Sequence, residues 1–147
     1  MSIVSRFPVV TIAASVGLGF LIGTGVAPSL VGHAQADKRV FELRTYTAHP
    51  GKLAAVNARF RNHTAKLLAK YGMTNIGYWT PQDPPLGENT LIYVLAHVDR
   101  EAAKKSWDAF RKDPDWIKAR TESEAQGPIV SKVESVFMSA TDYSPLK

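Results

Sequence analysis

The sequence predicts an α+β domain of the ferredoxin-like type, with element order β-α-β-β-α-β and a four-stranded antiparallel sheet whose helices lie on one face. Three observations lead to this prediction. Residues 40–47 (VFELRTYT) alternate strictly between two sets of side chains, as a strand with two different faces does. Residues 90–98 (TLIYVLAHV) are apolar at both parities, so both faces of that strand need cover. Helical patterns separate the strands.

The first strand is predicted to place its two sets of side chains in different surroundings. The apolar set suits a core against helices, and it comprises Phe41, Leu43 and Thr45. The other set is predicted to face away from the helices, and it comprises Glu42, Arg44 and Tyr46. A carboxylate, a guanidinium and a phenol on one face are candidates for binding a ligand.

The first helix is predicted between His49-Pro50-Gly51, which is typical of a turn, and Gly72, which suits the end of a helix. A second strand follows at residues 74–80. Residues 81–89 contain three prolines, so the sequence predicts a long turn without regular structure.

The second helical region is predicted to begin at Asp99, a capping residue, and to restart at Asp113-Pro114. Gly127-Pro128 ends it, and a last strand is predicted at residues 129–138. The first and last strands are neighbours in this topology. We therefore expect Glu42 and Arg44 to meet partners across that pair, on the face away from the helices; these partners are Lys132 and Glu134.

Residues 1–36 read as a targeting segment. Arg6 precedes an apolar run over residues 9–26, and Ala34-Gln35-Ala36 is a small-x-small site of the kind that signal peptidase cleaves. The sequence therefore predicts an exported protein, periplasmic or secreted, whose mature domain is residues 37–147. The alternative is a membrane anchor formed by residues 7–32, because the apolar run is long enough to span a bilayer.

Composition argues against several classes of protein. The chain has 147 residues, a net charge of +5 and no cysteine, which rules out disulfides, thiolate nucleophiles and Fe–S ligation. All but one of the 18 Lys and Arg residues, and all 13 Asp and Glu residues, lie in residues 37–147. They are spread out, whereas a nucleic-acid-binding protein more often has a dense basic stripe. No nucleic-acid partner is predicted.

The chain resembles the NIPSNAP family in seven segments that follow one another in order: FELRTYT, HPGKL, GYWT, NTLIYVLAH, SWDAFRKDPDWIKARTESEAQGPIV, KVESVFM and TDYSPLK. The resemblance implies a ferredoxin-like domain that pairs sheet to sheet as a dimeric α/β barrel, similar to antibiotic-synthesis monooxygenases and haem-degrading enzymes. The family has no agreed reaction. The resemblance therefore implies a homodimer and leaves its activity open.

Candidate site residues follow from the predicted barrel lining. The ligand-binding candidates are Glu42, Arg44, Tyr46, Trp79 and Tyr93. His97 is the catalytic candidate, as a base or as an axial haem ligand. The four histidines lack metal-ligand spacing, so no metal site is predicted, and the sequence requires no cofactor, although haem suits the resemblance. His63 is expected to be a partly buried structural histidine.

Three functions compete at this point. The first is a homodimeric barrel that binds a small apolar or aromatic ligand, with haem handling or monooxygenase-type oxidation as its chemistry if it is an enzyme. The second is a non-catalytic protein-protein interaction module, and the third is a carrier of hydrophobic cargo. The alternative to a binding pocket is a structural role, in which four charged residues form a cross-strand ion-pair network that holds the dimer; these are Glu42, Arg44, Lys132 and Glu134.

Overall fold

The computed structural model describes residues 39–147. The predicted targeting segment, residues 1–36, lies outside the described residues, so its role as a signal peptide or an anchor stays a prediction. Within residues 39–147, no helix is long and apolar enough to cross a membrane.

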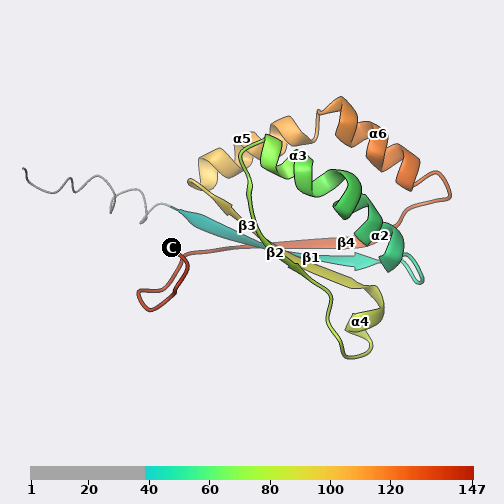
Figure 1. The fold of residues 1–147 in the computed structure, drawn as a ribbon, viewed down its shortest axis with the longest axis horizontal. Coiled ribbons are helices and arrows are strands. Elements are labelled where there is room, and N and C mark those ends of the chain that lie inside the picture. Colours follow the sequence, from blue (N-terminus) through green and yellow to red (C-terminus); the bar gives the residue numbers. More distant parts are fainter. Residues whose placement is uncertain (1–38) are drawn as a thin grey trace, which may run out of the picture.

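One four-stranded antiparallel sheet forms the centre of the domain (Figure 1). Its strands are β1 (Val40–Ala48), β2 (Thr74–Trp79), β3 (Thr90–His97) and β4 (Val130–Met138). They lie in the order β2-β3-β1-β4, with antiparallel pairing throughout. This order, with the first and last strands side by side, confirms the predicted ferredoxin-like fold.

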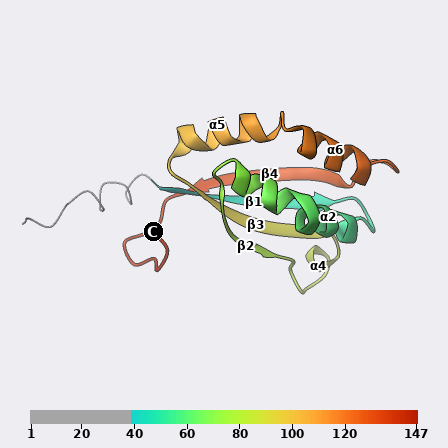
Figure 2. The ribbon, with the colours of Figure 1, turned by 45° about the horizontal axis from the view of Figure 1, so that its top comes forward.

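Two helical segments lie on one face of the sheet (Figure 2). The first is α2 (Leu53–Arg59), continued through a π-helical turn η1 (Phe60–Thr64) into α3 (Ala65–Lys70). The second is α5 (Arg100–Phe110) followed by α6 (Pro114–Ser123). Three of the helix ends form as the sequence predicts, but α6 ends at Ser123, before the predicted stop at Gly127-Pro128.

Three residues set those ends. Asp99 accepts a hydrogen bond from the backbone N–H of Ala102 at 2.7 Å, and Asp113 accepts from the first turn of α6. Gly72 adopts a φ of +75°, which favours glycine, just after α3.

The segment between β2 and β3 corrects one prediction. A single helical turn, α4 (Leu86–Asn89), lies within residues 81–89, which were expected to be irregular throughout. Pro85 is compatible with this turn because it stands directly before it, where proline's fixed φ and missing N–H disturb no helical hydrogen bond.

The faces of β1 are the reverse of the prediction. Tyr93 of β3 packs in the core under the helices, and Arg44 of β1 lies directly opposite it. Residues directly opposite each other on paired strands point to the same face of the sheet. Glu42, Arg44 and Tyr46 therefore face the helices, while Phe41 and Leu43 face away. The physical reason is that this side offers partners to both kinds of side chain. Tyr46 packs there against Phe60 and Tyr93, and Glu42 accepts a hydrogen bond there from Trp107 on α5.

The face of the sheet away from the helices is mainly apolar. It consists of Phe41, Leu43, Thr45, Ile92, Val94, Trp79, Val136 and Met138, with Lys132 and Glu134 towards one end. The expected contact of Lys132 and Glu134 with Glu42 and Arg44 is therefore wrong. On β1, Thr47 lies opposite Lys132 and Thr45 lies opposite Glu134. Lys132 and Glu134 instead form an ion pair with each other, with Nζ and Oε1 2.8 Å apart.

Candidate functional site

A buried carboxylate is the centre of the polar cluster between the sheet and α5. Glu42 is 1% exposed and its two oxygens accept four hydrogen bonds. Oε1 accepts from Arg44 Nη1 and from the Ser135 hydroxyl, both at 2.7 Å. Oε2 lies 2.7 Å from Trp107 Nε1, which donates to it, and 2.9 Å from His97 Nε2. Three strands and one helix thus meet on one side chain.

The hydrogen bonds keep this carboxylate ionised. Burial by itself raises the pKa of Glu42, but hydrogen bonds from His97, Ser135, Trp107 and Arg44 outweigh it and lower the pKa from 4.5 to about 2. The side chain is therefore a fixed negative charge in the layer between sheet and helix at neutral pH.

Arg44 is the charged donor of the cluster that reaches the surface. Its side chain is 16% exposed, and its guanidinium lies 4.2 Å from the ring centre of Trp107 and 5.8 Å from that of Tyr46. Val133 and Ser135 project from β4 on the same side of the sheet and are both exposed. The helices therefore leave this part of the sheet open beside Arg44.

Tyrosines extend the site across the sheet. Tyr78, Tyr93, Arg44 and Ser135 are successive cross-strand partners, so they form one row over four strands. Tyr78 stacks on Tyr93 with ring centres 5.5 Å apart, and Tyr46 meets Tyr93 edge-on at 5.5 Å. Burial raises the pKa of Tyr93 well above 10, so its hydroxyl keeps its proton.

Three buried polar atoms of this region have no hydrogen-bond partner among the described residues. They are Nε of Arg44, the hydroxyl oxygen of Tyr93 and Nδ1 of His97. Most buried polar atoms of folded proteins have a partner, so three such atoms in one layer single out this region. Arg44 and Tyr93 stand opposite each other on adjacent strands, and both can donate.

His97 supports Glu42 from within the protein. Its side chain is 1% exposed, and Nε2 contacts Glu42. A haem iron needs an accessible imidazole nitrogen, and neither ring nitrogen of His97 is accessible. The geometry does not fit an axial haem ligand, and no haem chemistry follows from it.

Trp79 lies apart from the other candidates. It pairs with Ile92, whose side chain is on the helix-free face, whereas the remaining predicted residues are on the helix side. The structure therefore brings together Glu42, Arg44, Tyr46, Tyr93 and His97, and it leaves Trp79 on the other face of the sheet.

Two residues of the cluster were missed by sequence reasoning. Neither Trp107 nor Ser135 was among the sequence-predicted site residues, yet both donate hydrogen bonds to Glu42. One signal was available, because a buried tryptophan N–H usually needs an acceptor and a buried glutamate needs donors. Ser135 carries no comparable signal in the sequence.

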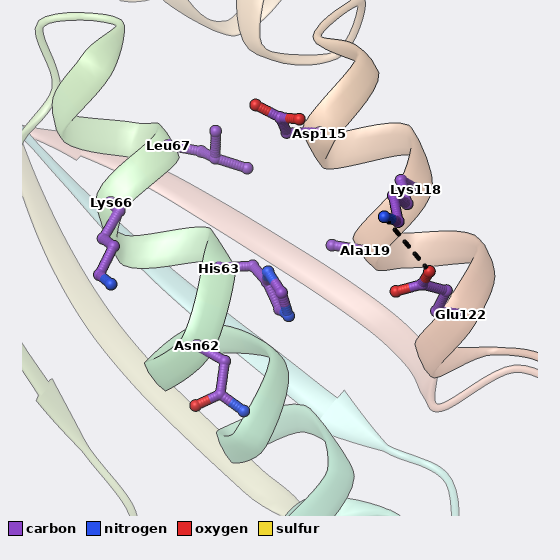
Figure 3. Close-up of a pocket in the computed structure, with 8 residues that line it drawn as sticks. All are labelled: Asn62, His63, Lys66, Leu67, Asp115, Lys118, Ala119 and Glu122. Carbon is purple, nitrogen blue, oxygen red and sulfur yellow. Dashed lines mark ion pairs between the residues drawn. The ribbon is translucent and has the colours of Figure 1, made fainter.

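A separate cavity of about 340 Å³ lies between the two helical segments (Figure 3). His63 projects from η1 towards Ala119 and Glu122 of α6. His63 is exposed, so the expectation that it is partly buried is wrong. Lys118 and Glu122 lie at 3.9 Å on α6 itself.

Comparison with solved structures identifies similar folds. A NIPSNAP family protein from Agrobacterium tumefaciens is 19% identical, with a TM-score of 0.65 over 74% of this chain and 99% of that one. A NIPSNAP-like domain protein from Burkholderia xenovorans is 17% identical, with a TM-score of 0.64 over 74% and 90%. SnoaB, a cofactor-independent oxygenase from Streptomyces nogalater, is 16% identical, with a TM-score of 0.50 over 74% and 98%.

These similarities establish the fold, because the structural neighbours have the dimeric α/β-barrel fold. No curated protein matches the sequence. The NIPSNAP family profile matches residues 41–145, which is most of the chain and contains every candidate residue described above. The protein belongs to the NIPSNAP family.

Proposed function

We propose that the protein is a homodimer that binds a small aromatic ligand carrying an acceptor oxygen, such as a carboxylate, beside Arg44. One observation carries this proposal: the Arg44 guanidinium is a permanent charge at an open part of the sheet, 4.2 Å from the ring centre of Trp107 and 5.8 Å from that of Tyr46. Ligand sites combine apolar walls with a few convergent polar groups, and this region has both.

The guanidinium has donors to spare. Arg44 has five N–H groups, and the hydrogen bond to Glu42 uses Nη1. The hydrogen bond to Glu42 holds the guanidinium in place, and the rings of Trp107 and Tyr46 provide apolar surface next to it. A flat aromatic acid can place its ring against these side chains and its carboxylate on the remaining N–H groups.

The side chains around Arg44 support binding, and no reaction is assigned to them. SnoaB is called an oxygenase, but 16% identity relates the two proteins only by fold. His97, the acid–base candidate, is buried behind Glu42 and does not reach the open side of Arg44. A ligand beside Arg44 would instead contact Tyr46, Trp107 and Ser135.

A paired-ligand titration tests the site. We expect 2-naphthoate to bind the wild-type protein and to change its tryptophan fluorescence, and 2-methylnaphthalene, which lacks the acceptor, to bind roughly tenfold or more weakly. Arg44→Met should remove the difference between the two ligands. Lys132→Met, on the other face of the sheet, is the matched control and should bind like wild type.

Two results would contradict the proposal. One is equal binding of the two ligands by the wild-type protein, since a charge-anchored site must distinguish them. The other is no binding of either ligand, which would favour the interaction module.

The argument for a homodimer comes from the helix-free face of the sheet. This face exposes apolar side chains of all four strands, and monomeric soluble proteins rarely expose a continuous apolar patch of this kind. A second copy of the chain, placed sheet to sheet, would cover it. The pairing of two copies is therefore part of the proposal.

A single charge tests the dimer. Val136, on the helix-free face, and Ile117, on α6, are both about half exposed. Val136→Asp should convert the dimer into a monomer in light scattering, because it would bury an unpaired charge between the sheets. Ile117→Asp should stay dimeric. A wild-type monomer at micromolar concentration, or a dimeric Val136→Asp, would rule out this interface.

A further inference from the structure

A pocket of about 220 Å³ lies between the α2-η1-α3 segment and the strands β2 and β3. Its lining consists of four residues of the helical segment and two of the sheet: Asn57, Phe60, Arg61, Ala65, Tyr78 and Leu91. Tyr78 lies opposite Tyr93, and Leu91 lies opposite Tyr46, so both side chains point towards the helices. The sheet-to-sheet dimer proposed above covers the other face of the sheet and leaves this pocket open.

The apolar wall of the pocket is fixed by contacts within the protein. The ring of Tyr78 stacks on that of Tyr93 with ring centres 5.5 Å apart, and its hydroxyl donates to Asn75 Oδ1 at 2.7 Å. Asn75 Nδ2 donates to the backbone oxygen of Ala65 at 2.9 Å, which ties β2 to α3. Burial raises the pKa of Tyr78 to about 12, so its hydroxyl keeps the proton that it donates. The wall therefore needs no ligand to hold its shape.

The helical wall of the pocket contains the π-helical turn. Asn57, Arg61 and Ala65 are spaced by four residues, so they form one ridge along the helical segment. The turn η1 begins at Phe60, and the hydroxyl of Thr64 donates to a backbone oxygen five residues earlier. Turns of this kind are rare inside helices and occur frequently at functional sites.

Arg61 places a charge without a counter-ion at the mouth of the pocket. Its side chain is exposed, whereas the apolar lining residues Phe60 and Leu91 are buried. No ion pair within the described part of the chain involves the Arg61 guanidinium. A carboxylate at this mouth would gain charge-assisted hydrogen bonds without breaking an existing pair. The amide of Asn57, one turn earlier, can donate to the same group.

The volume restricts the ligand to a single ring. Small-molecule sites usually measure roughly 300–1,000 Å³, so a pocket of about 220 Å³ is small. Its three apolar side chains include two aromatic rings, Phe60 and Tyr78, which favour a flat aromatic body.

We propose that this pocket is a second binding site, for a small one-ring aromatic carboxylate. The ring would lie against Phe60, Tyr78 and Leu91, and the carboxylate would accept hydrogen bonds from Arg61. This site does not depend on the function proposed for Arg44, because the two arginines lie on different elements and only the pocket beside η1 uses Arg61.

A ¹⁹F NMR titration of the full-length protein tests the charge. We expect 4-fluorobenzoate to bind saturably, and fluorobenzene, which lacks the carboxylate, to bind about tenfold more weakly. Arg61→Met should remove this difference. Arg111→Met is the matched control, because Arg111 is exposed at the end of α5 and does not line the pocket, and it should bind both ligands like wild type.

A second pair of variants tests the volume. Ala65→Leu should fill the pocket and weaken binding of 4-fluorobenzoate about tenfold, while the charge of Arg61 is kept. Ala69→Leu, one turn later on α3, is its control, because Ala69 is exposed and does not line the pocket. It should bind within about twofold of wild type.

Other outcomes would overturn the inference. One is no binding of 4-fluorobenzoate, and another is an unchanged preference for it in Arg61→Met, which would place the acid elsewhere. A third is displacement of 4-fluorobenzoate by 2-naphthoate, whose fused rings are too large for this pocket, because it would assign both acids to the site beside Arg44. Failure of that site alone would leave the binding of 4-fluorobenzoate unchanged, so the two proposals fail separately.

Discussion

Glu42→Gln is expected to lower the free energy of unfolding by about 3–5 kcal/mol, the range found when one partner of a buried ion pair is removed. The glutamine keeps the size of the side chain but not its charge. It leaves the guanidinium of Arg44 without its counter-ion, and its amide replaces one of the two acceptor oxygens that now receive hydrogen bonds from Ser135 and Trp107.

Urea denaturation of wild type, Glu42→Gln and Glu134→Gln would measure this effect. Glu134 is the matched control, because it is exposed on β4 and pairs only with Lys132. Its replacement should change the unfolding free energy by less than about 1 kcal/mol. Similar effects of the two substitutions would mean that the buried cluster does not stabilise the fold.

Acid should remove the same stabilisation. The pKa of Glu42 is about 2 in the folded protein and 4.5 when unperturbed, so the unfolded chain binds more protons between these values. The contribution of Glu42 is therefore complete above pH 4.5, falls as the pH falls, and is lost near pH 2. A difference of about 2.5 pKa units corresponds to about 3 kcal/mol.

Unfolding free energies measured in urea between pH 2 and pH 6 would test this dependence. The wild-type protein should lose stability below pH 4.5, and Glu42→Gln should lose about 3 kcal/mol less over the same range. Parallel curves for the two proteins would show that other carboxylates cause the loss.

The fold was predictable because its signals are local. Asp99, Asp113 and Gly72 mark helix ends through the chemistry of their own side chains or backbone, and the structure confirms all three. The strand at 40–47 is indicated by the alternation of its side chains, and the strand at 90–98 by its apolar composition. Given the order of these elements along the chain, the rules for connecting strands and helices then allow only a few sheet topologies.

The direction of each face was not predictable in the same way. The strand at 90–98 is apolar on both parities, so its sequence gives no preference for which side meets the helices. The buried position of Glu42 depends on Trp107 and Ser135, which are distant in the sequence. Only the register of three strands and the placement of α5 bring them together. The five candidates on β1 and β3 do lie together, but on the helix side of the sheet and without Trp79, because the prediction had the faces reversed.

The most direct test of the site beside Arg44 separates its structural role from its binding role. The double variant Glu42→Gln, Arg44→Met removes both charges and leaves no unpaired ion, so it should be more stable than either single variant. It keeps Trp107 and Tyr46, and hence the apolar walls.

Titration of this folded double variant with 2-naphthoate is the deciding measurement. We expect at least a tenfold loss of affinity relative to wild type, with binding of 2-methylnaphthalene unchanged. Wild-type affinity for 2-naphthoate in the double variant would show that Glu42 and Arg44 are a structural ion pair and do not bind a ligand.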